Sequence, residues 1–367
     1  MAAHLPEIVV SFKQKAATFF TRSTRGVLFL IVREANPDTE SEDPLTPYVT
    51  EMSQDTVLTA WNETNQQYIK DVLAVDPYKF FVVTIDTNGT IKSATDLIEL
   101  TYPTGRVTMV GVAADYSALV TWAKGLKKYH VLTHATTGSN SRYVENLYAQ
   151  QIVWDDDDHG TGAQSSITFL PTLGALLCKA NTAGVTYAVV DQLKKVTNVG
   201  NETAENAAIN AGNLILRNDW KGTDQVVRIG TAVNTLTTFD DSDNMEDFRY
   251  IEVAEAADMI REDISSVFRD SYVGKKNSFD NQILFISQIL QYFDELADEE
   301  IINPDGSKTV EIDADAQREA WIPYKPEAAD WDDDMVKIHP FKRQVFIRSQ
   351  IQILQAMQDL TMEITLD

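Results

Sequence analysis

Cysteine and long apolar runs are nearly absent from this 367-residue chain. The single cysteine, Cys178, excludes an intramolecular disulfide and is typical of a reducing compartment. The longest uninterrupted apolar run covers residues 27–32. It is far shorter than the roughly 20 residues that span a bilayer, so we expect no membrane insertion. The first residues also lack the apolar core of a signal peptide. We therefore expect synthesis and folding in a cytoplasm.

Basic residues are scarce as well. The chain has 31 Lys and Arg against 55 Asp and Glu, which gives a formal net charge of −24. Because nucleic acids bind basic surfaces, we do not expect nucleic acid as a partner. Local basic clusters do occur at residues 124–128 and at Lys275 and Lys276, and they are candidates for contact with an acidic partner. The apolar content of 44% is that of a folded protein, and the length suits two or three domains.

Catalytic motifs are missing too. The chain has no Gly-x-Ser-x-Gly, no phosphate-binding Gly-x4-Gly-Lys-Ser/Thr and no His-Glu-x-x-His. The nearest approach to a phosphate loop, at residues 160–165, lacks the third glycine. Cys178 lies in an apolar helical pattern and is expected to be a buried thiol. We therefore predict no catalytic residue and no cofactor. An α/β hydrolase-like or nucleotide-binding enzyme with an accessory domain stays as the alternative.

Two groups of residues are candidate metal ligands. Residues 155–158 are four consecutive aspartates, followed by His159. They lack the alternating spacing of a calcium loop, and four adjacent carboxylates cannot converge on one ion, so a solvated loop is expected. His130 and His134 are four apart on a predicted strand without a third ligand, which favours core or surface positions over zinc. No metal site is predicted.

Strand-like alternation marks two segments near the ends of the sequence. Apolar and polar residues alternate over 360–367 and again over 8–13, as in strands with one buried face. Terminal residues fray unless something holds them, and a lone strand must find a sheet. We therefore predict two arms that pair with other copies of the chain. Their apolar residues are Ile8, Val10 and Phe12 in the first arm, and Leu360, Met362, Ile364 and Leu366 in the second.

Between the arms, strand and helix patterns alternate up to about residue 230. Strands are expected at 27–33, 78–87, 106–113, 130–133, 151–154, 185–190, 213–217 and 225–230. Helices are expected at 55–74, 116–128, 141–148, 167–180 and 202–211, and a hairpin turn at 87–90. Such alternation predicts a largely parallel sheet covered by helices.

The pattern changes after an acidic stretch at residues 238–243. Two long helices follow, over 254–270 and about 283–297, then a strand at 309–312 and a short helix at 314–319. A half-buried strand comes next and is the candidate acceptor for an arm. Its alternating apolar residues are Val345, Ile347, Ile351 and Ile353. The predicted class is α/β, or α+β overall, with a helix-covered mixed sheet and a C-terminal α+β domain.

Several short motifs in the C-terminal half occur in a characteristic order. They are Val-Arg-Ile-Gly-Thr-Ala-Val-Asn-Thr-Leu at 227–236, Phe-Arg-Tyr-Ile at 248–251, Ser-Tyr-Val-Gly-Lys-Lys-Asn-Ser at 271–278 and Asn-Gln-Ile-Leu at 281–284. Together they resemble the C-terminal domain of contractile phage tail sheath proteins. Leu-Pro-Glu-Ile-Val at 5–9 and Arg-Gly-Val-Leu-Phe-Leu at 25–30 are similar to the opening arm and first core strand of that family. Glu7 departs from the family, which often has glycine there.

The resemblance implies a structural subunit that polymerises as six-fold rings or a helix around an inner tube and contracts. It implies an N-terminal arm at 1–20, an outer α/β domain at 21–237, an inner sheath domain at 238–355 and a C-terminal arm at 356–367. The expected partners are other copies, the tube protein, and baseplate and tail terminator proteins, in a virion or phage-tail-like particle assembled in a bacterial cytoplasm. The candidate tube contacts are Arg269, Lys275 and Lys276. A tube or baseplate component is a third possibility, but tube proteins are usually smaller and rich in β-strands.

Overall fold

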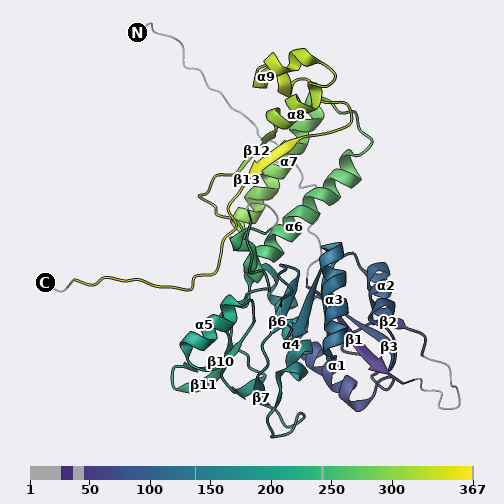
Figure 1. Cartoon of the computed structure of the whole chain (residues 1–367), viewed down its shortest axis with the longest axis vertical. Helices are drawn as coiled ribbons and strands as arrows, with labels where there is room; N and C mark the ends of the chain where they lie inside the picture. The colour runs from purple at the N-terminus through teal and green to yellow at the C-terminus, as the bar shows by residue number, and fades with distance from the viewer. Residues whose placement is uncertain (1–25, 36–44, 137, 241–243, 366–367) are drawn as a thin grey trace, which may run out of the picture. The chain divides into compact units, whose positions relative to one another are not determined.

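A computed structural model of the protein describes residues 26–35, 45–136, 138–240 and 244–365 (Figure 1). The described residues form two compact units. The first, which we call the sheet unit, holds residues 26–259 and 354–365, and the second, the C-terminal unit, holds residues 260–353. Helix α6 (Ile251–Val267) begins in the sheet unit and ends in the C-terminal unit. Within the described ranges, no helix combines the length and apolar character needed to cross a membrane.

A six-stranded sheet is the centre of the sheet unit, with strand order β2-β3-β1-β4-β5-β6. All neighbouring strands run parallel except β2, which pairs antiparallel with β3 at one edge. The predicted helix-covered, largely parallel sheet is therefore confirmed. Its strands are β1 (Val27–Glu34), β2 (Tyr48–Glu51), β3 (Lys79–Asp86), β4 (Gly105–Met109), β5 (Tyr129–His134) and β6 (Val144–Leu147).

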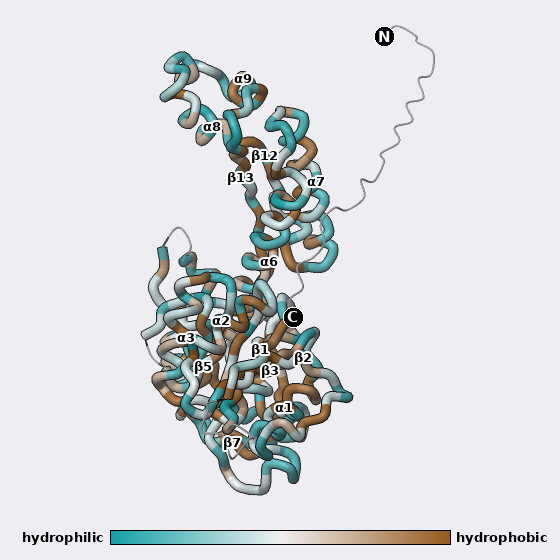
Figure 2. Tube along the Cα trace, turned by 90° about the vertical axis from the view of Figure 1, so that its right-hand side faces the viewer, coloured by the Kyte–Doolittle hydropathy of each residue, from teal (hydrophilic) through white to brown (hydrophobic). Residues whose placement is uncertain are grey.

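Helices cover both faces of this sheet. Alternate residues of a strand point to opposite faces, and β1 is buried on both of them. Leu28, Leu30 and Val32 pack in one apolar cluster with α1 and α4, whereas Phe29 and Ile31 lie in another with α2 and α3. The strands consequently form the apolar interior in Figure 2. These helices are α1 (Glu63–Val75), α2 (Ile91–Thr101), α3 (Ala113–Leu126) and α4 (Leu170–Ala180).

Two small antiparallel sheets and one helix complete the sheet unit. One sheet has strand order β8-β7-β9, and the other is the hairpin of β10 and β11. These elements are β7 (Gln151–Trp154), β8 (Gln164–Ser165), β9 (Leu193–Val196), α5 (Glu202–Asn210), β10 (Leu216–Lys221) and β11 (Asp224–Ile229).

The C-terminal unit is built on long helices and one small sheet. Its core includes Tyr292, Phe293 and Leu296, all fully buried on α7. A single π-helical turn, Phe268–Tyr272, ends α6. Strands β12 and β13 pair antiparallel and form a two-stranded sheet. The elements are α7 (Phe279–Asp298), β12 (Thr309–Ile312), α8 (Ala314–Trp321), α9 (Asp333–Lys337) and β13 (Ile347–Gln350).

Four local expectations were wrong. The predicted helix at 141–148 is strand β6, whose four residues are all buried. The predicted hairpin turn at 87–90 leads instead into α2, because the Thr90 side chain caps that helix. Helix α1 begins only at Glu63, after the Asn62 cap. Residues 185–190 form one isolated bridge, between Val189 and Arg228, where a strand was expected.

Candidate functional site

Six charged side chains meet in the interior of the sheet unit, and we call them the ion cluster. Strands β4, β5 and β6 and the start of α6 supply most of them. All six are at most 6% exposed. The cluster consists of Arg106, His130, Arg142, Glu145, Glu255 and Asp258.

Arg106 and Glu145 are the centre of the ion cluster. The Arg106 guanidinium donates two parallel hydrogen bonds to Glu145, from Nε at 3.1 Å and from Nη2 at 2.9 Å. The same Nη2 also donates to Glu255 Oε1 at 3.0 Å, which ties helix α6 to strand β4. Burial raises the pKa of the Glu145 carboxyl, but Arg106 and His130 outweigh it and hold that pKa below its usual value.

His130 joins two carboxylates through its two ring nitrogens. Nδ1 lies 3.0 Å from Glu145 Oε1, and Nε2 lies 3.1 Å from Asp258 Oδ2. Burial lowers the pKa of His130, but Glu255, Asp258 and Glu145 outweigh it and raise the pKa to about 9. The imidazole is therefore protonated at neutral pH. With Arg106 and Arg142 it makes three positive charges, which balance the three carboxylates.

Arg142 completes the ion cluster from the loop before β6. Its Nη2 donates to Asp258 Oδ1 at 2.7 Å and to the Tyr143 hydroxyl at 2.9 Å. The guanidinium also stacks on Phe248, 4.5 Å from the ring centroid. Each charge of the cluster thus has an opposite charge at hydrogen-bond distance, which is how buried ions become tolerable.

The ion cluster also contains a set of metal-type ligands, but its chemistry disfavours a metal. Ligand atoms of His130, Glu145 and Glu255 lie within 4.8 Å of one another. A metal needs the lone pair of a neutral imidazole. His130 is protonated, and Arg106 already bridges the two glutamates. The guanidinium therefore occupies the cation position of this set.

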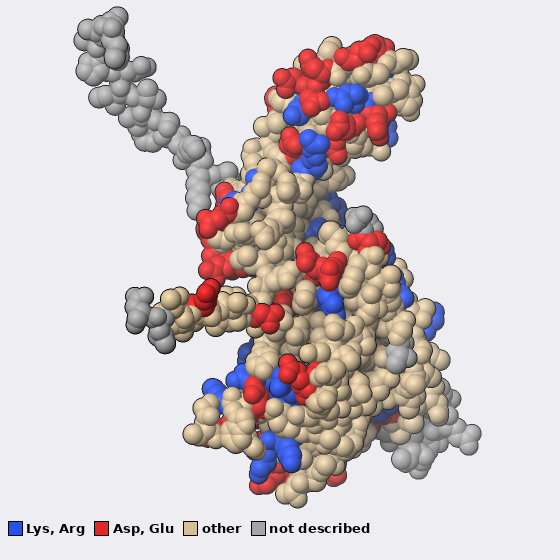
Figure 3. Space-filling model, turned by 60° about the vertical axis from the view of Figure 1, so that its left-hand side comes forward, with Lys and Arg blue, Asp and Glu red and all other residues tan. Residues whose placement is uncertain are grey.

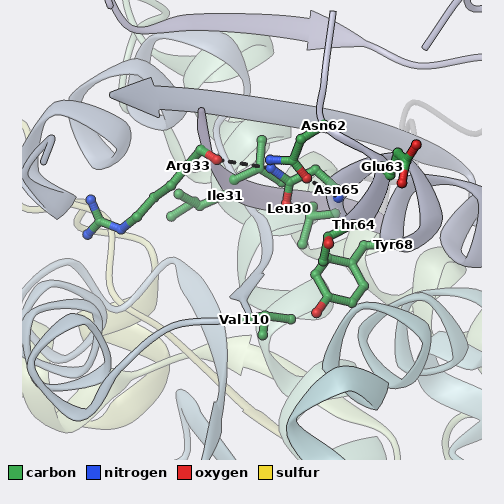
Figure 4. A pocket seen from close by; sticks show the side chains of 10 residues that line it. Leu30, Ile31, Arg33, Asn62, Glu63, Thr64, Asn65, Tyr68 and Val110 are labelled. Carbon is green, nitrogen blue, oxygen red and sulfur yellow. Dashed lines mark hydrogen bonds between the residues drawn. The ribbon is translucent and has the colours of Figure 1, made fainter. Parts of the chain in front are cut away.

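A cavity of about 640 Å³ lies at the carboxyl end of β1 (Figure 4). Ligands of open α/β sheets bind where the strand order reverses. The order reverses at β1, because β3 lies on one side of this strand and β4 lies on the other. The one cation in the lining, Arg33, donates to Gly89 O at 2.6 Å and to Asp115 at 2.7 Å. In Figure 4 its side chain leads away from the other lining residues. The titratable side chains of the lining besides Arg33 are Glu63 and Tyr68.

His159 holds the acidic loop after β7 in place by ring stacking and by contacts with two aspartates. The imidazole stacks on Trp154 at 3.7 Å between centroids and contacts Asp156 and Asp71 at 2.7 and 3.0 Å. Burial lowers the pKa of His159, whereas the two aspartates raise it more. Residues 155–158 themselves are exposed, as expected for a solvated loop. Cys178 is buried, as expected, and burial raises the pKa of its thiol to about 12.

A second cavity, of about 460 Å³, lies in the C-terminal unit between the α6–α7 junction and residues 342–345, and we call it the basic groove. Its lining includes the aromatic side chains of Phe268, Tyr272 and Phe285. Four exposed cations also line it: Lys275, Lys276, Lys342 and Arg343. Of the predicted tube contacts, the two lysines line this groove, whereas Arg269 pairs with Asp270 at 3.3 Å.

The predicted arm residues fall in different places. Ile8, Val10, Phe12 and Leu366 lie outside the described residues. The segment after β13 is assigned no strand over 354–365, and Figure 3 shows it leaving the surface with carboxylates as its charged groups. Leu360 is 86% exposed, and Met362 and Ile364 are 68% exposed. Large apolar side chains with this much solvent exposure are typical of a segment that binds another molecule.

The predicted acceptor residues lie in and around β13. Ile347 belongs to the strand, and Val345, Ile351 and Ile353 flank it, all half-buried. One edge of this segment pairs with β12 and, through Ile353, with Ile302. Among the described residues the other edge has no strand beside it. The structure therefore offers an open edge where an acceptor was expected.

The ion cluster is what sequence reasoning missed. Arg106, His130 and Glu145 stand within segments that are otherwise apolar, and charged residues in such segments are a signal of internal pairing. Their partners Glu255 and Asp258 are more than 100 residues away in the sequence. No local pattern joins them, so the pairing was not predicted.

Three comparisons bear on what kind of protein this is. Residues 243–367 match the family model of the phage tail sheath C-terminal domain. The tail sheath protein of Clostridium phage phiCD119 is 25% identical over 99% of both chains. The helical sheath of the anti-feeding prophage in its contracted state has a similar structure, with a TM-score of 0.66, 15% identity and full coverage of both chains. A sheath tail protein from Desulfitobacterium hafniense matches 84% of this chain and 94% of its own, with a TM-score of 0.64 and 13% identity.

The fold defines a class first: α/β proteins with the fold of sheath subunits. The particular resemblance predicted from the sequence, to contractile phage tail sheath proteins, is confirmed by the family model, by the phage relative and by the sheath structures.

Proposed function

We propose that this chain is the structural subunit of a contractile tail sheath. One observation carries the proposal: an exposed segment with strand-like alternation and a strand with an open edge occur in the same polypeptide. Copies of the chain can therefore pair, the arm of one adding to the β13 edge of another. The sheath relatives support this assignment.

The open edge of β13 can be described by residue. Phe346 O and Gln352 O accept hydrogen bonds from Asp313 N and Asn303 N on the paired side. Backbone groups alternate in direction along a strand. The N–H and C=O groups of Ile347 and Ser349 consequently face the open edge, where an added strand would bond to them.

Strand addition supplies enough free energy to hold a polymer together. Each main-chain hydrogen bond contributes about 1 kcal/mol net. Burial of Leu360, Met362 and Ile364 adds roughly 1.5–3 kcal/mol each. We propose that a second arm, with Ile8, Val10 and Phe12, pairs in the same way. Subunits would then form six-fold rings or a six-start helix. Each subunit would consist of an N-terminal arm at 1–20, an outer domain at 21–237, an inner domain at 238–355 and a C-terminal arm at 356–367, and the two arms would join it to its neighbours.

In this proposal the sheath surrounds an inner tube and contracts to drive it through a cell envelope. We propose that no nucleotide is consumed, because the sequence has no phosphate loop. The extended sheath would be a metastable state set at assembly in a bacterial cytoplasm and released at a baseplate. The remaining partners in a phage or phage-tail-like particle would be baseplate and tail terminator proteins.

For the tube contact we propose the basic surface around Arg269, Lys275 and Lys276, which would face acidic tube patches. Arg269 is already paired with Asp270, so the two lysines carry the available charge. Replacing both lysines by glutamate should abolish assembly of sheath on tube. Unaltered assembly with the doubly substituted chain would contradict this contact.

The test of the proposed function is polymer formation. Electron microscopy of the purified chain should show hollow rods or rings, and a chain without residues 360–367 should stay a folded monomer. Ser349→Pro removes an N–H from the open edge of β13 and should block polymers with a folded monomer, because proline is tolerated at edges. Gln350→Pro, on the paired side, should destabilise the monomer. If the chain without residues 360–367 formed the same polymers as the full chain, strand exchange through this arm would be refuted.

A further inference from the structure

Glu252, in the first turn of α6, is a buried carboxylate that forms no ion pair with the described residues. Its side chain is 4% exposed, and neither oxygen has a well-oriented hydrogen-bond donor in the described part of the chain. Gly184 bounds the site closely, because a Cβ atom at that position would lie 3.1 Å from Glu252 Cβ. Burial of an unpaired ionised carboxylate is unfavourable, so such a group tends to bind a proton instead. Glu252 therefore differs from the carboxylates of the ion cluster, each of which has a cation beside it.

Residues 355–358 lie against the sheet unit of their own copy, and we call them the strap. Two side-chain hydrogen bonds hold the strap in place. Gln355 Nε2 donates to Asp247 Oδ1 at 2.9 Å, and Gln358 Oε1 accepts from Thr231 Oγ1 at 3.3 Å. All four side chains are at the surface, and exposed hydrogen bonds of this kind add little net free energy. The strap is therefore held weakly enough for a change beneath it to decide whether it stays bound.

Ala356, between the two hydrogen bonds, brings the strap to Glu252. Burial raises the pKa of the Glu252 carboxyl, while the backbone N–H groups of Glu252 and Ala356 lower that pKa by less. The net shift is upward from 4.5. A carboxyl whose pKa is raised by burial is more stable protonated as long as the cover stays in place.

The elements packed against Glu252 offer no charge to balance an ionised carboxylate. Three segments around it contain no titratable side chain: residues 181–186, residues 229–236 and the strap. Along α6 the next acid is Glu255, which belongs to the ion cluster. Before α6, Arg249 donates to Ile209 O, and Asp247 adds a second acidic group beside the strap.

We propose that Glu252 is a pH-sensitive switch for the strap: the protonated carboxyl keeps the strap on the sheet unit, and the ionised carboxylate releases it. Release admits water to the carboxylate and so provides the hydration that an ionised group needs. Because the pKa of Glu252 is higher under the strap than in water, closure is favoured most at low pH and weakens as pH rises through the raised pKa. The switch acts within one copy. Its consequence for assembly, a freer root for the arm at 359–367 as pH rises, rests on the proposed function.

Spin-label mobility tests the proposal. Met357→Cys places a nitroxide on a fully exposed residue of the strap, and Cys178 is buried and stays unlabelled. In the full chain, kept below its polymerisation concentration, the mobile fraction of the spectrum should rise at least threefold between about pH 5 and pH 8. Glu252→Gln, which has a similar shape and no charge, should remove this rise and keep the label at its low-pH mobility. Asp247→Asn is the matched control, because it keeps an oxygen for Gln355, and the rise should persist in it.

Two results would overturn the proposal: the same rise in the natural chain and in Glu252→Gln, or equal mobility at both pH values in the natural chain. If Glu252→Gln fails to fold, the double variant Gln355→Ala with Gln358→Ala provides the test. It removes both hydrogen bonds of the strap and should show the high mobility already at about pH 5, and low mobility there would equally contradict the switch.

Electron microscopy separates this failure from failure of the proposed function. Rods formed by a chain without the pH-dependent rise would leave the sheath assignment intact and remove the switch. A chain that shows the rise but forms no rods at any concentration would keep the switch and remove the assignment.

Discussion

The sheet unit and the C-terminal unit differ in how they use charge and apolar surface. In the sheet unit, three cations and three carboxylates are paired inside the fold. In the C-terminal unit, four cations line an open groove without a carboxylate partner in the described ranges, and one edge of β13 has no neighbouring strand there. The first arrangement is complete within one copy, whereas the second leaves cations and a strand edge without partners among the described residues.

The contrast separates the interactions that hold the fold together from those that the proposed assembly would use. Buried, fully paired ions specify how elements pack but add little net stability, and removal of one partner is strongly destabilising. Exposed cations and open edges cost a monomer little and become useful only when a partner excludes water. Substitutions in the two units should therefore have different consequences for unfolding and for assembly.

The largest effect is expected at Glu145. Glu145→Ala leaves the Arg106 guanidinium and protonated His130 without their common partner in the interior. Uncompensated buried charge costs about 3–5 kcal/mol. Urea unfolding should show a loss of that size. Asp96→Ala, which removes an exposed ion pair with Lys92, is the control and should cost under about 1 kcal/mol. Equal losses would mean that the ion cluster is not an internal support.

Much of this fold could be predicted because local patterns carry it. Strands β1 and β3 are apolar on both faces, so their sequences identify buried strands without any partner. Strand β6 could not be recognised, because Glu145 and Asn146 are polar and are buried by bonds to residues distant in sequence. Helix α2 was missed because the Thr87–Thr90 sequence suits a turn, while only the structure shows Thr90 as a cap.

The candidate sites also differ in whether local sequence patterns could predict them. Period-two alternation, which depends on neighbouring residues alone, predicted both the arm at 360–367 and the strand around Ile347, and the structure confirms the strand as β13. The basic groove was predicted only in part. Lys275 and Lys276 form a basic cluster in the sequence, but Lys342 and Arg343 come close to them only in the folded chain. The ion cluster, which brings Arg106 to Glu255, depends entirely on tertiary structure.

The second prediction concerns pH. Because the pKa of His130 is raised from 6.5 to about 9 in the folded chain, its contribution is complete below about pH 6.5 and is lost as pH rises through about 9. The shift corresponds to roughly 3 kcal/mol. The difference in unfolding free energy between the natural chain and His130→Gln should therefore shrink between pH 7 and pH 10. A difference that stays constant over this range would mean that His130 is neutral in the fold.

The third prediction compares the two units through their helix caps. Asn62 caps α1 in the sheet unit, where its side chain accepts from Asn65 N, and Ser278 caps α7, where it accepts from Asn281 N. Alanine at either position should cost about 1 kcal/mol. Hydrogen exchange should report the Asn62→Ala loss in the sheet unit and the Ser278→Ala loss in the C-terminal unit. If each variant loosened both units equally, the two would unfold as one.

The smallest effect on unfolding, and the largest contrast with assembly, is expected at Met362. This side chain is 68% exposed, so Met362→Thr should change the unfolding free energy of the monomer by less than about 0.5 kcal/mol. In a polymer the same side chain would be buried, and its loss should remove roughly 1.5 kcal/mol per subunit. The concentration needed for polymerisation, measured by light scattering, should then rise about tenfold.

Thr361→Ser is the matched control, because Thr361 lies on the opposite face of an extended arm and should leave that concentration unchanged. Equal effects of both substitutions would mean that the arm does not dock as a strand with one buried face. A loss of monomer stability at Met362 comparable to that at Glu145 would remove the contrast itself, since the arm would then belong to the fold of its own copy.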